Sequence, residues 1–319
     1  MVTAVVIVWG EVLWDRFPDG AQLGGAPANV AWHLAQLGTP VALVTRVGDD
    51  ADGHAAIAAL AARGVDTRLI QIDGERATGE VTVAVEHGEP RYQLIGGRAW
   101  ERIALTDDVA DALVAARAIV FGTLAQRTDD GHAGLAAALE LASPRVLRVC
   151  DPNLRNTSPT ANGPPADALE ARQRGARADQ HLWHLRALEQ ALAAADVVKV
   201  GEREVAQIAA HTDRADPVAW LLERGARLVA VTRGADGSRW HAPDFAGLDI
   251  AAVPARAGGN NVGCGDAYTA ALVHGLLAGW PWPRIGRLAS LLGGEVAGHR
   301  GATPILDAAR IAALIAEAT

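Results

Sequence analysis

Hydrophobic and polar positions in the first sixty residues alternate between strand-like and helix-like spacing. Residues 2–9 form a short apolar run, and residues 26–38 repeat apolar side chains at helical spacing. Pro27 and Gly38 mark the limits of this helix, because proline favours the first turn and glycine the position after the last. A second strand at residues 41–48 and a second helix at 53–64 follow.

Residues 79–95 break this rhythm with strand-like alternation on both sides of a turn at residues 88–90. This pattern predicts a β-hairpin. We place it, together with residues 11–22, in a small sheet that projects from the main body.

The alternation of strands and helices then resumes as far as residue 234. We predict a helix capped by Thr106, strands near residues 116–122, 145–153, 196–200 and 226–234, and helices near 130–142, 181–195 and 202–211. Residues 156–180 are rich in Pro, Gly, Ala and polar side chains and predict a long surface loop. Strands separated by helices favour one α/β domain with a doubly wound, mostly parallel sheet, which binds ligands at the carboxyl ends of its strands.

A glycine-rich turn closed by an acid precedes a further predicted helix near the C-terminus. The turn contains Gly263, Cys264 and Gly265, and Asp266 follows in the first helical turn. Backbone N–H groups at a helix start have no intrahelical partner and suit phosphate oxygens. Asp266 has two possible roles, as a helix cap or as a base that takes a proton from a nucleophile.

Composition and charge exclude several classes of protein. The formal net charge is −8 with no basic stripe, so we expect neither nucleic-acid nor membrane binding. Lys199 is the only lysine and no Gly-Lys pair occurs, which excludes a Walker A loop. The short opening apolar run lacks a basic n-region and continues straight into acidic sequence, so we expect a first β-strand and not a signal peptide. Cys150 and Cys264 suit buried thiols, so we expect a cytoplasmic protein. The ten histidines show no metal-binding spacing such as HExxH.

The motifs together resemble the PfkB (ribokinase-like) family of sugar kinases. The matching stretches, between residue 10 and about residue 304, are "GEVLWD", "GGAPANVA", "VGDDADG", "FGTLAQR", "DPNLR", "ADVVKVGEREV", "VTRGADG" and "VGCGDAY". The first glycine motif and "DPNLR" are most similar to those of fructokinases. The resemblance implies one ribokinase-like domain over residues 1–319, with a β-sheet lid formed by about 11–22 and 79–97. It also implies transfer of the γ-phosphate of ATP, with Mg²⁺, to a primary hydroxyl of a ketohexose, and a homodimer formed through the lid.

The resemblance assigns roles residue by residue. Asp266 matches the catalytic base, and Gly263, Cys264 and Gly265 match the anion hole. Asp15, Gly25 and Asn29 match sugar-binding positions, Glu204 matches the acid that orders hydrated magnesium, and Arg155 is expected to face the phosphates. Thr232, Gly234 and Gly237 match the nucleotide-side turn.

Simpler structural roles remain open for several of these residues. Asp15 could be a surface charge in a turn, and Asn29 a polar group in a first helical turn. Glu204 could belong to a solvated helix start, where acids favour the macrodipole. Arg155 could pair with Asp151.

The sequence departs from the family at two points that bear on cations. Asn260 and Asn261 stand where the family usually has Asp-Thr, whose aspartate helps to hold a monovalent cation. A neutral amide loses most of that attraction, which puts potassium activation in doubt. Gly201 stands where Asn or Ser is common.

Rival functions follow from the same motifs. Ribose, 2-keto-3-deoxygluconate and nucleoside kinases are alternatives within the family, and a sugar-binding regulator without turnover is an alternative outside catalysis. The carboxylate of Asp266 argues against the regulator, because a binding protein needs no base there. A nicotinamide-dependent oxidoreductase is disfavoured, because "GEVLWD" replaces the G-x-G-x-x-G loop after the first strand.

Overall fold

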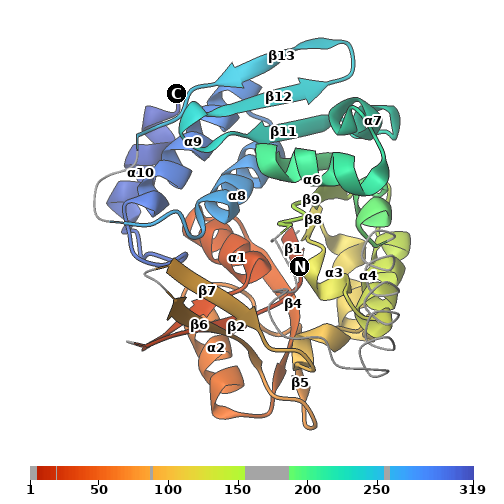
Figure 1. The fold of residues 1–319 in the computed structure, drawn as a ribbon, viewed down its shortest axis with the longest axis vertical. Coiled ribbons are helices and arrows are strands. Elements are labelled where there is room, and N and C mark those ends of the chain that lie inside the picture. Colours follow the sequence, from red (N-terminus) through yellow and green to blue (C-terminus); the bar gives the residue numbers. More distant parts are fainter. Residues whose placement is uncertain (1–5, 19, 87–88, 155–186, 255–258) are drawn as a thin grey trace.

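A computed structural model describes residues 6–18, 20–86, 89–154, 187–254 and 259–319 of the chain. Within them, a nine-stranded sheet forms the centre of the molecule (Figure 1). In spatial order its strands are β13 (Phe245–Ile250), β12 (Ser238–Ala242), β11 (Leu228–Thr232), β10 (Val197–Gly201), β9 (Leu147–Cys150), β8 (Ala118–Phe121), β1 (Val6–Trp9), β4 (Val41–Gly48) and β5 (Ile70–Asp73). All neighbouring pairs are parallel except β11 with β12 and β12 with β13.

Helices cover both faces of this sheet, as continuous apolar strands require. One face packs against α1 (Ala26–Gln36), α2 (Ala51–Ala61), α8 (Cys264–Leu277), α9 (Trp282–Ala297) and α10 (Ala308–Glu317). The other packs against α3 (Asp107–Ala115), α4 (Asp129–Leu141), helical residues 187–193, α6 (Glu202–Thr212) and α7 (Pro217–Glu223). Short 3₁₀ turns are η1 (Ala99–Arg102), η2 (Leu124–Gln126) and η3 (Gly234–Asp236). The structure confirms the helices predicted for α1, α2, α3, α4, α6 and α8, including Thr106 as the cap of α3, whereas α7, α9 and α10 were not predicted.

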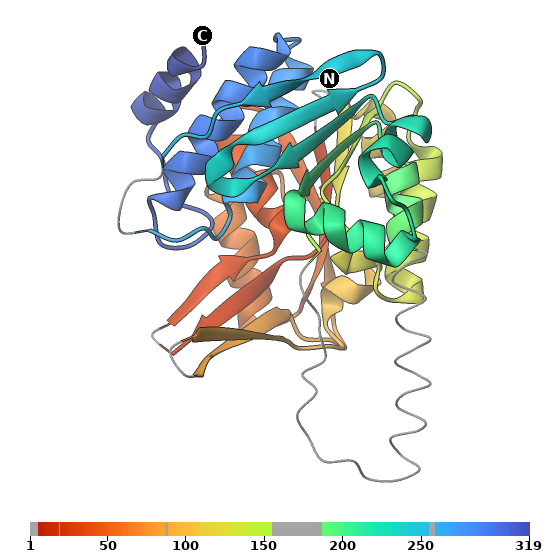
Figure 2. The ribbon, with the colours of Figure 1, turned by 45° about the horizontal axis from the view of Figure 1, so that its top comes forward.

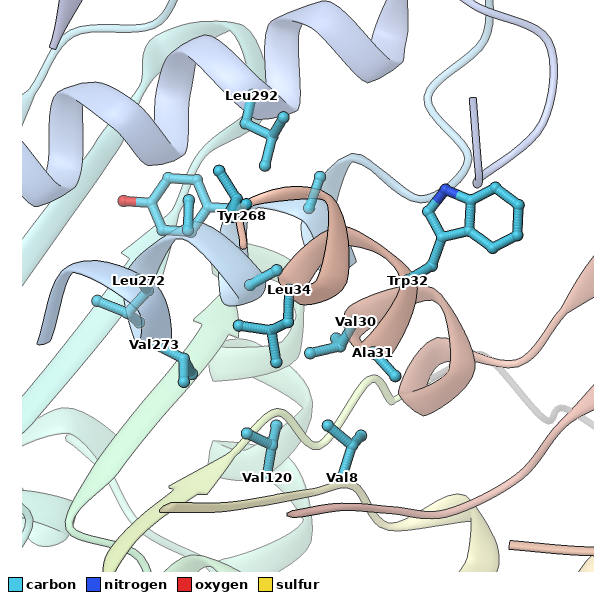
Figure 3. Close-up of a cluster of buried hydrophobic side chains, with 14 of the residues drawn as sticks. Val8, Val30, Ala31, Trp32, Leu34, Val120, Tyr268, Leu272, Val273 and Leu292 are labelled. Carbon is cyan, nitrogen blue, oxygen red and sulfur yellow. The ribbon is translucent and has the colours of Figure 1, made fainter. Parts of the chain in front are cut away.

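The core of the first face joins α1 to α8 over the central strands. Figure 3 shows Val30 and Leu34 of α1 between the sheet residues Val8 and Val120 and the side chains of α8. Leu34 is fully buried. Helices α1 and α8 therefore form one packed unit, and their N-termini carry most of the candidate site.

A second, four-stranded sheet stands out from the main body (Figure 2). Its order is β3 (Gly20–Gly24), β2 (Leu13–Phe17), β6 (Gly79–Glu86) and β7 (Glu89–Leu94), in which only β2 and β6 pair in parallel. The two sheets confirm the predicted fold class. The predicted turn at residues 88–90 was too long, because Glu89 and Pro90 already pair with β6. A proline is tolerated at the start of β7 because β7 is an edge strand.

The order of strands changes direction at β1, which has β4 on one side and β8 on the other. Such a switch point opens a crevice at the carboxyl ends of the strands. A pocket lies there, and its lining includes Glu11, Thr123, Asp151 and Asn153.

Candidate active site

Helix α8 begins at a turn whose backbone excludes a side chain. Gly263 is the N-cap with φ 80°, and a Cβ on it would lie 2.5 Å from the Cα of Ala302. Cys264 and Gly265 open the helix, so their N–H groups lie at its positive end without intrahelical partners. The turn can therefore receive an anion close to the backbone.

Asp266 and Asn29 meet across 237 residues of sequence. The Nδ2 of Asn29 donates a hydrogen bond to the Oδ2 of Asp266 at 2.7 Å. Asp266 is 7% exposed and Asn29 is 3% exposed. This contact fixes the orientation of the carboxylate and joins the first turns of α1 and α8.

The oxygen side of the Asn29 amide differs from its nitrogen side. Its Oδ1 is buried and has no hydrogen-bond partner within the part of the chain that the structure describes. A buried polar atom without a partner is costly, so the position favours a hydroxyl donor from a bound molecule.

Gly25 brings the small sheet close to the start of α1. It is the N-cap of α1 with φ 100°, and a Cβ on it would lie 2.5 Å from the carbonyl oxygen of Glu11. Asp15 of β2 lies beside the preceding residue, because a Cβ on Gly24 would meet its Oδ2. Asp15, Gly25 and Asn29 therefore gather around one helix start.

A buried ion pair lies beneath the glycine turn, and no sequence motif predicted it. The Nζ of Lys199 lies 3.0 Å from the Oδ2 of Asp151, and this oxygen also accepts a hydrogen bond from Thr269 at 2.7 Å. A Cβ on Gly265 would lie 2.9 Å from the same Nζ. In the sequence, Lys199 served only to exclude a Walker A loop, although a single lysine at the centre of a buried strand is itself a signal of special use.

The charge of Lys199 is maintained by the acids around it. Burial alone would lower its pKa, but the carboxylates of Asp151, Glu204 and Asp266 raise the pKa above its ordinary value. A charged ammonium group therefore lies next to the first turn of α8. This adds a full positive charge to a helix end that already favours anions.

Glu204 closes the start of α6 and reaches toward β9. Its Oε2 accepts the N–H of Gly201 at 2.6 Å, and its Oε1 accepts the N–H of Leu154 at 2.5 Å. Burial, and then the nearby Asp151 carboxylate, raise the pKa of Glu204. The residue is therefore a structural cap that also lies beside the Lys199–Asp151 pair.

The predicted nucleotide-side turn follows β11. Thr232 ends the strand and pairs with Ser238, while Gly234 and Gly237 between them have φ 57° and 83°. A Cβ on Gly237 would collide with the carbonyl oxygen of Ile250, so the turn needs glycine. Because Thr232 also pairs with Gly201 of β10, this turn lies beside the end of the strand that carries Lys199 and leads into Glu204 of α6.

The remaining candidates from the sequence have simple outcomes. Arg155 lies outside the described residues. Burial raises the pKa of the Cys264 thiol to about 11, and the pKa of Cys150 is raised as well, so both sulfurs are protonated at neutral pH.

In the described ranges, no cluster of three or more His, Cys, Asp or Glu residues is arranged to hold a metal ion. No described helix is both long enough and apolar enough to span a bilayer.

A charged cluster ties the small sheet to the main body. Glu80 of β6 pairs with Arg98 and lies 3.6 Å from Arg16 of β2, which also pairs with Asp52 at the start of α2. These contacts connect two strands of the small sheet with each other and with the body.

A second cluster lies where the chain leaves β7. Arg127 pairs with the carboxylate of Glu101 and stacks 4.6 Å from the ring centre of Trp100. Gly97 donates its N–H to the same carboxylate at 3.0 Å. Arg127 follows η2, so the cluster links the end of the small sheet to the segment after β8.

Comparisons with known proteins identify the family of this chain. Two segments, residues 20–177 and 166–309, match the pfkB family of carbohydrate kinases, and the chain belongs to that family. It is 30% identical to a fructokinase of Escherichia coli over 86% of this chain and 85% of the relative. It is 28% identical to a putative sugar kinase of Pyrococcus horikoshii over 92% of this chain and 86% of the relative.

A solved structure shows the same fold at low sequence identity. A fructokinase with bound ATP from Xylella fastidiosa superimposes with a TM-score of 0.80 at 22% identity, covering 98% of both chains. The family match over residues 20–177 and 166–309 confirms the resemblance to the PfkB family inferred from the sequence motifs.

Proposed function

We propose that this protein is an ATP-dependent kinase that phosphorylates a primary hydroxyl of a ketohexose, with D-fructose as the substrate. The observation that carries the proposal is the buried Asp266, which lies in the first turn of α8 and is oriented by Asn29. Relatives named fructokinase at about 30% identity support fructose. ATP is supported by the ATP complex of a structural neighbour.

Asp266 acts as the general base in this proposal. The sugar hydroxyl oxygen attacks the γ-phosphorus, its proton passes to the Asp266 carboxylate, and the bond from the γ-phosphorus to the ADP oxygen breaks. The N–H groups after Gly263 stabilise the charge on the transferring group. Phosphoryl transfer depends mainly on alignment and charge stabilisation, which these groups supply.

Lys199 supplies the counter-charge beneath the phosphates. Its Nζ lies close to the Cα of Gly265, where a side chain would otherwise project, and its hydrogen bond to Asp151 keeps it in place. The Thr232, Gly234 and Gly237 turn is proposed to hold the nucleotide. Arg155 is proposed to face the phosphates.

Glu204 is suited to bind a magnesium ion through intervening water molecules and not by direct coordination. Each carboxylate oxygen already accepts one backbone N–H, which leaves further lone pairs for water molecules. Magnesium usually keeps several waters when it binds with substrate phosphates. When bound, the ion neutralises negative charge on the β- and γ-phosphates.

A monovalent cation does not fit the residues near the glycine turn. Asn260 replaces a carboxylate, and its Oδ1 accepts the N–H of Val262 at 3.1 Å. A neutral amide that already has a partner attracts a cation weakly. The proposed reaction therefore uses no potassium ion.

The small sheet is proposed to act as a lid over the sugar. Asp15 and Gly25 connect it to Asn29, and the cluster of Arg16, Glu80 and Arg98 holds its base. Its edge strands β3 and β7 are proposed to pair with a second copy of the chain, which light scattering would test.

A substrate panel tests the proposed function. Fructose, ribose, 2-keto-3-deoxygluconate and nucleosides are compared at equal concentrations with ATP and Mg²⁺, and ADP release is coupled to a detectable reaction. The proposal expects fructose to give the highest kcat/KM. A higher value for another acceptor would replace fructose, and no transfer to any acceptor would favour a sugar-binding regulator.

A further inference from the structure

Tyr268 forms a buried polar link between the catalytic helix and the strand after the nucleotide-side turn. Its hydroxyl lies 2.6 Å from the Oγ of Ser238 and accepts the indole N–H of Trp240 at 2.8 Å. Ser238 and Trp240 are fully buried, and Tyr268 is 7% exposed. In Figure 3 the phenol oxygen points away from α1, on the side of the ring opposite the backbone.

Both ends of this link lie close to groups assigned to ATP. Tyr268 is one helical turn after Cys264 and two residues after Asp266. Ser238 directly follows Gly237 and pairs with Thr232, so it closes the nucleotide-side turn. The Tyr268 hydroxyl therefore joins the phosphate end of the site to its nucleotide end.

The turn is fixed on its other sides by backbone contacts. Arg233 donates its N–H to the carbonyl of Gly237 at 2.7 Å, and Ser238 pairs with Ile250 of β13. These contacts hold the turn on the sheet, but they do not involve α8. The hydroxyl of Tyr268 supplies a direct hydrogen-bonded connection to that helix.

We propose that Tyr268 is a positioning residue that sets the distance between the nucleotide-side turn and the N–H groups at the start of α8. This inference rests on the proposed kinase function. A nucleotide contacts both ends at once, so a loosened link weakens its binding. The sugar is expected to contact Asn29 and the lid, so its binding is affected little.

The test compares Tyr268→Phe with the wild-type chain and with Val273→Ala. Val273 is buried on the same helix, and its truncation destabilises the core without touching Ser238. Tyr268→Phe is expected to raise the KM for ATP and the Kd for ADP by about five- to tenfold, with the sugar KM changed less than about twofold. Val273→Ala is expected to lower stability and to leave the ratio of the two KM values unchanged.

A double variant tests whether the hydroxyl acts through Ser238. If it does, Ser238→Ala combined with Tyr268→Phe should weaken ADP binding less than the product of the two single effects. An unchanged Kd for ADP in Tyr268→Phe, or equal rises in both KM values, overturns the proposal. Binding of ADP is measured without turnover, so a wild-type chain that binds ADP but transfers no phosphate contradicts the kinase function alone. A wild-type chain that binds no ADP contradicts both.

Discussion

The amide nitrogen of Asn29 donates to the Oδ2 of Asp266 at 2.7 Å in a buried contact between the first turns of α1 and α8. Asn29→Ala removes this bond and the acceptor proposed for a sugar hydroxyl. We expect kcat/KM for the sugar to fall about 10- to 100-fold, while ADP binding is retained. Steady-state kinetics and calorimetry check this expectation. Unchanged kinetics would show that the contact has no part in catalysis.

Asn29→Asp gives a complementary result from the same position. It places a second carboxylate next to Asp266, and repulsion between like charges at this distance raises the higher of the pair's two pKa values. The acid limb of the kcat/KM profile should therefore move to higher pH than in the wild type. A profile identical to the wild type would contradict a role for Asp266 as the base.

Lys199 is expected to serve both stability and turnover, and two variants separate these roles. Lys199→Met leaves Asp151 as a buried charge without its cation and should cost about 3–5 kcal/mol of unfolding free energy. Lys199→Met combined with Asp151→Asn removes both charges and should recover much of that stability. Denaturant unfolding measures this recovery.

Turnover of the same double variant should stay at least about tenfold below the wild type, because no ammonium group remains near the phosphates. Coupled ADP release measures it. Full activity in a well-folded double variant would exclude Lys199 from the phosphate site.

Because His33 is buried, we expect the folded chain to lose stability in mildly acidic solution. Burial lowers its pKa from 6.5 to about 4, although its hydrogen bond to the Ala302 carbonyl opposes that shift. The unfolded chain therefore binds a proton at higher pH than the folded chain, so the contribution of His33 is complete above about pH 6.5 and falls as the pH drops toward 4. The full difference is about 3 kcal/mol.

Unfolding free energies of the wild type and His33→Gln at several pH values test this prediction. The advantage of the wild type should shrink as the pH falls from 7 to 4. A constant difference across that range would mean that His33 does not titrate on unfolding.

Because Asn260 carries no charge, we expect the rate of sugar phosphorylation to be independent of potassium. Because its side-chain oxygen accepts the N–H of Val262 and carries no charge, rates in potassium, sodium and choline buffers of equal ionic strength should agree within about twofold. Asn260→Asp restores the carboxylate and is the matched comparison. A wild-type rate that rises severalfold with potassium alone would contradict the prediction.

Much of the fold was predictable because local signals agree with it. Pro27 and Gly38 limit α1, Thr106 caps α3, and apolar runs mark the buried parallel strands. No element was predicted for residues 238–250, which form the antiparallel pair β12 and β13. These strands expose one face or edge, so their apolar pattern is weaker than that of a buried strand.

The candidate site was predictable only in part. Gly263 and Asp266 are recognisable from their spacing in a motif, whereas the bond between Asn29 and Asp266 joins residues that only the fold brings together. The pairing of Lys199 with Asp151 depends on the order of β9 and β10 in the sheet. Side chains from neighbouring strands carry no sequence signal of their contact.

The most direct measurement is the rate of sugar phosphorylation by Asp266→Ala, compared with the wild type at saturating ATP and sugar. Loss of the general base is expected to lower kcat by about 10²–10⁴-fold, while ADP still binds at the start of α8. Phosphorylation at the wild-type rate would contradict the assignment of Asp266 as the base and, with it, the proposed mechanism.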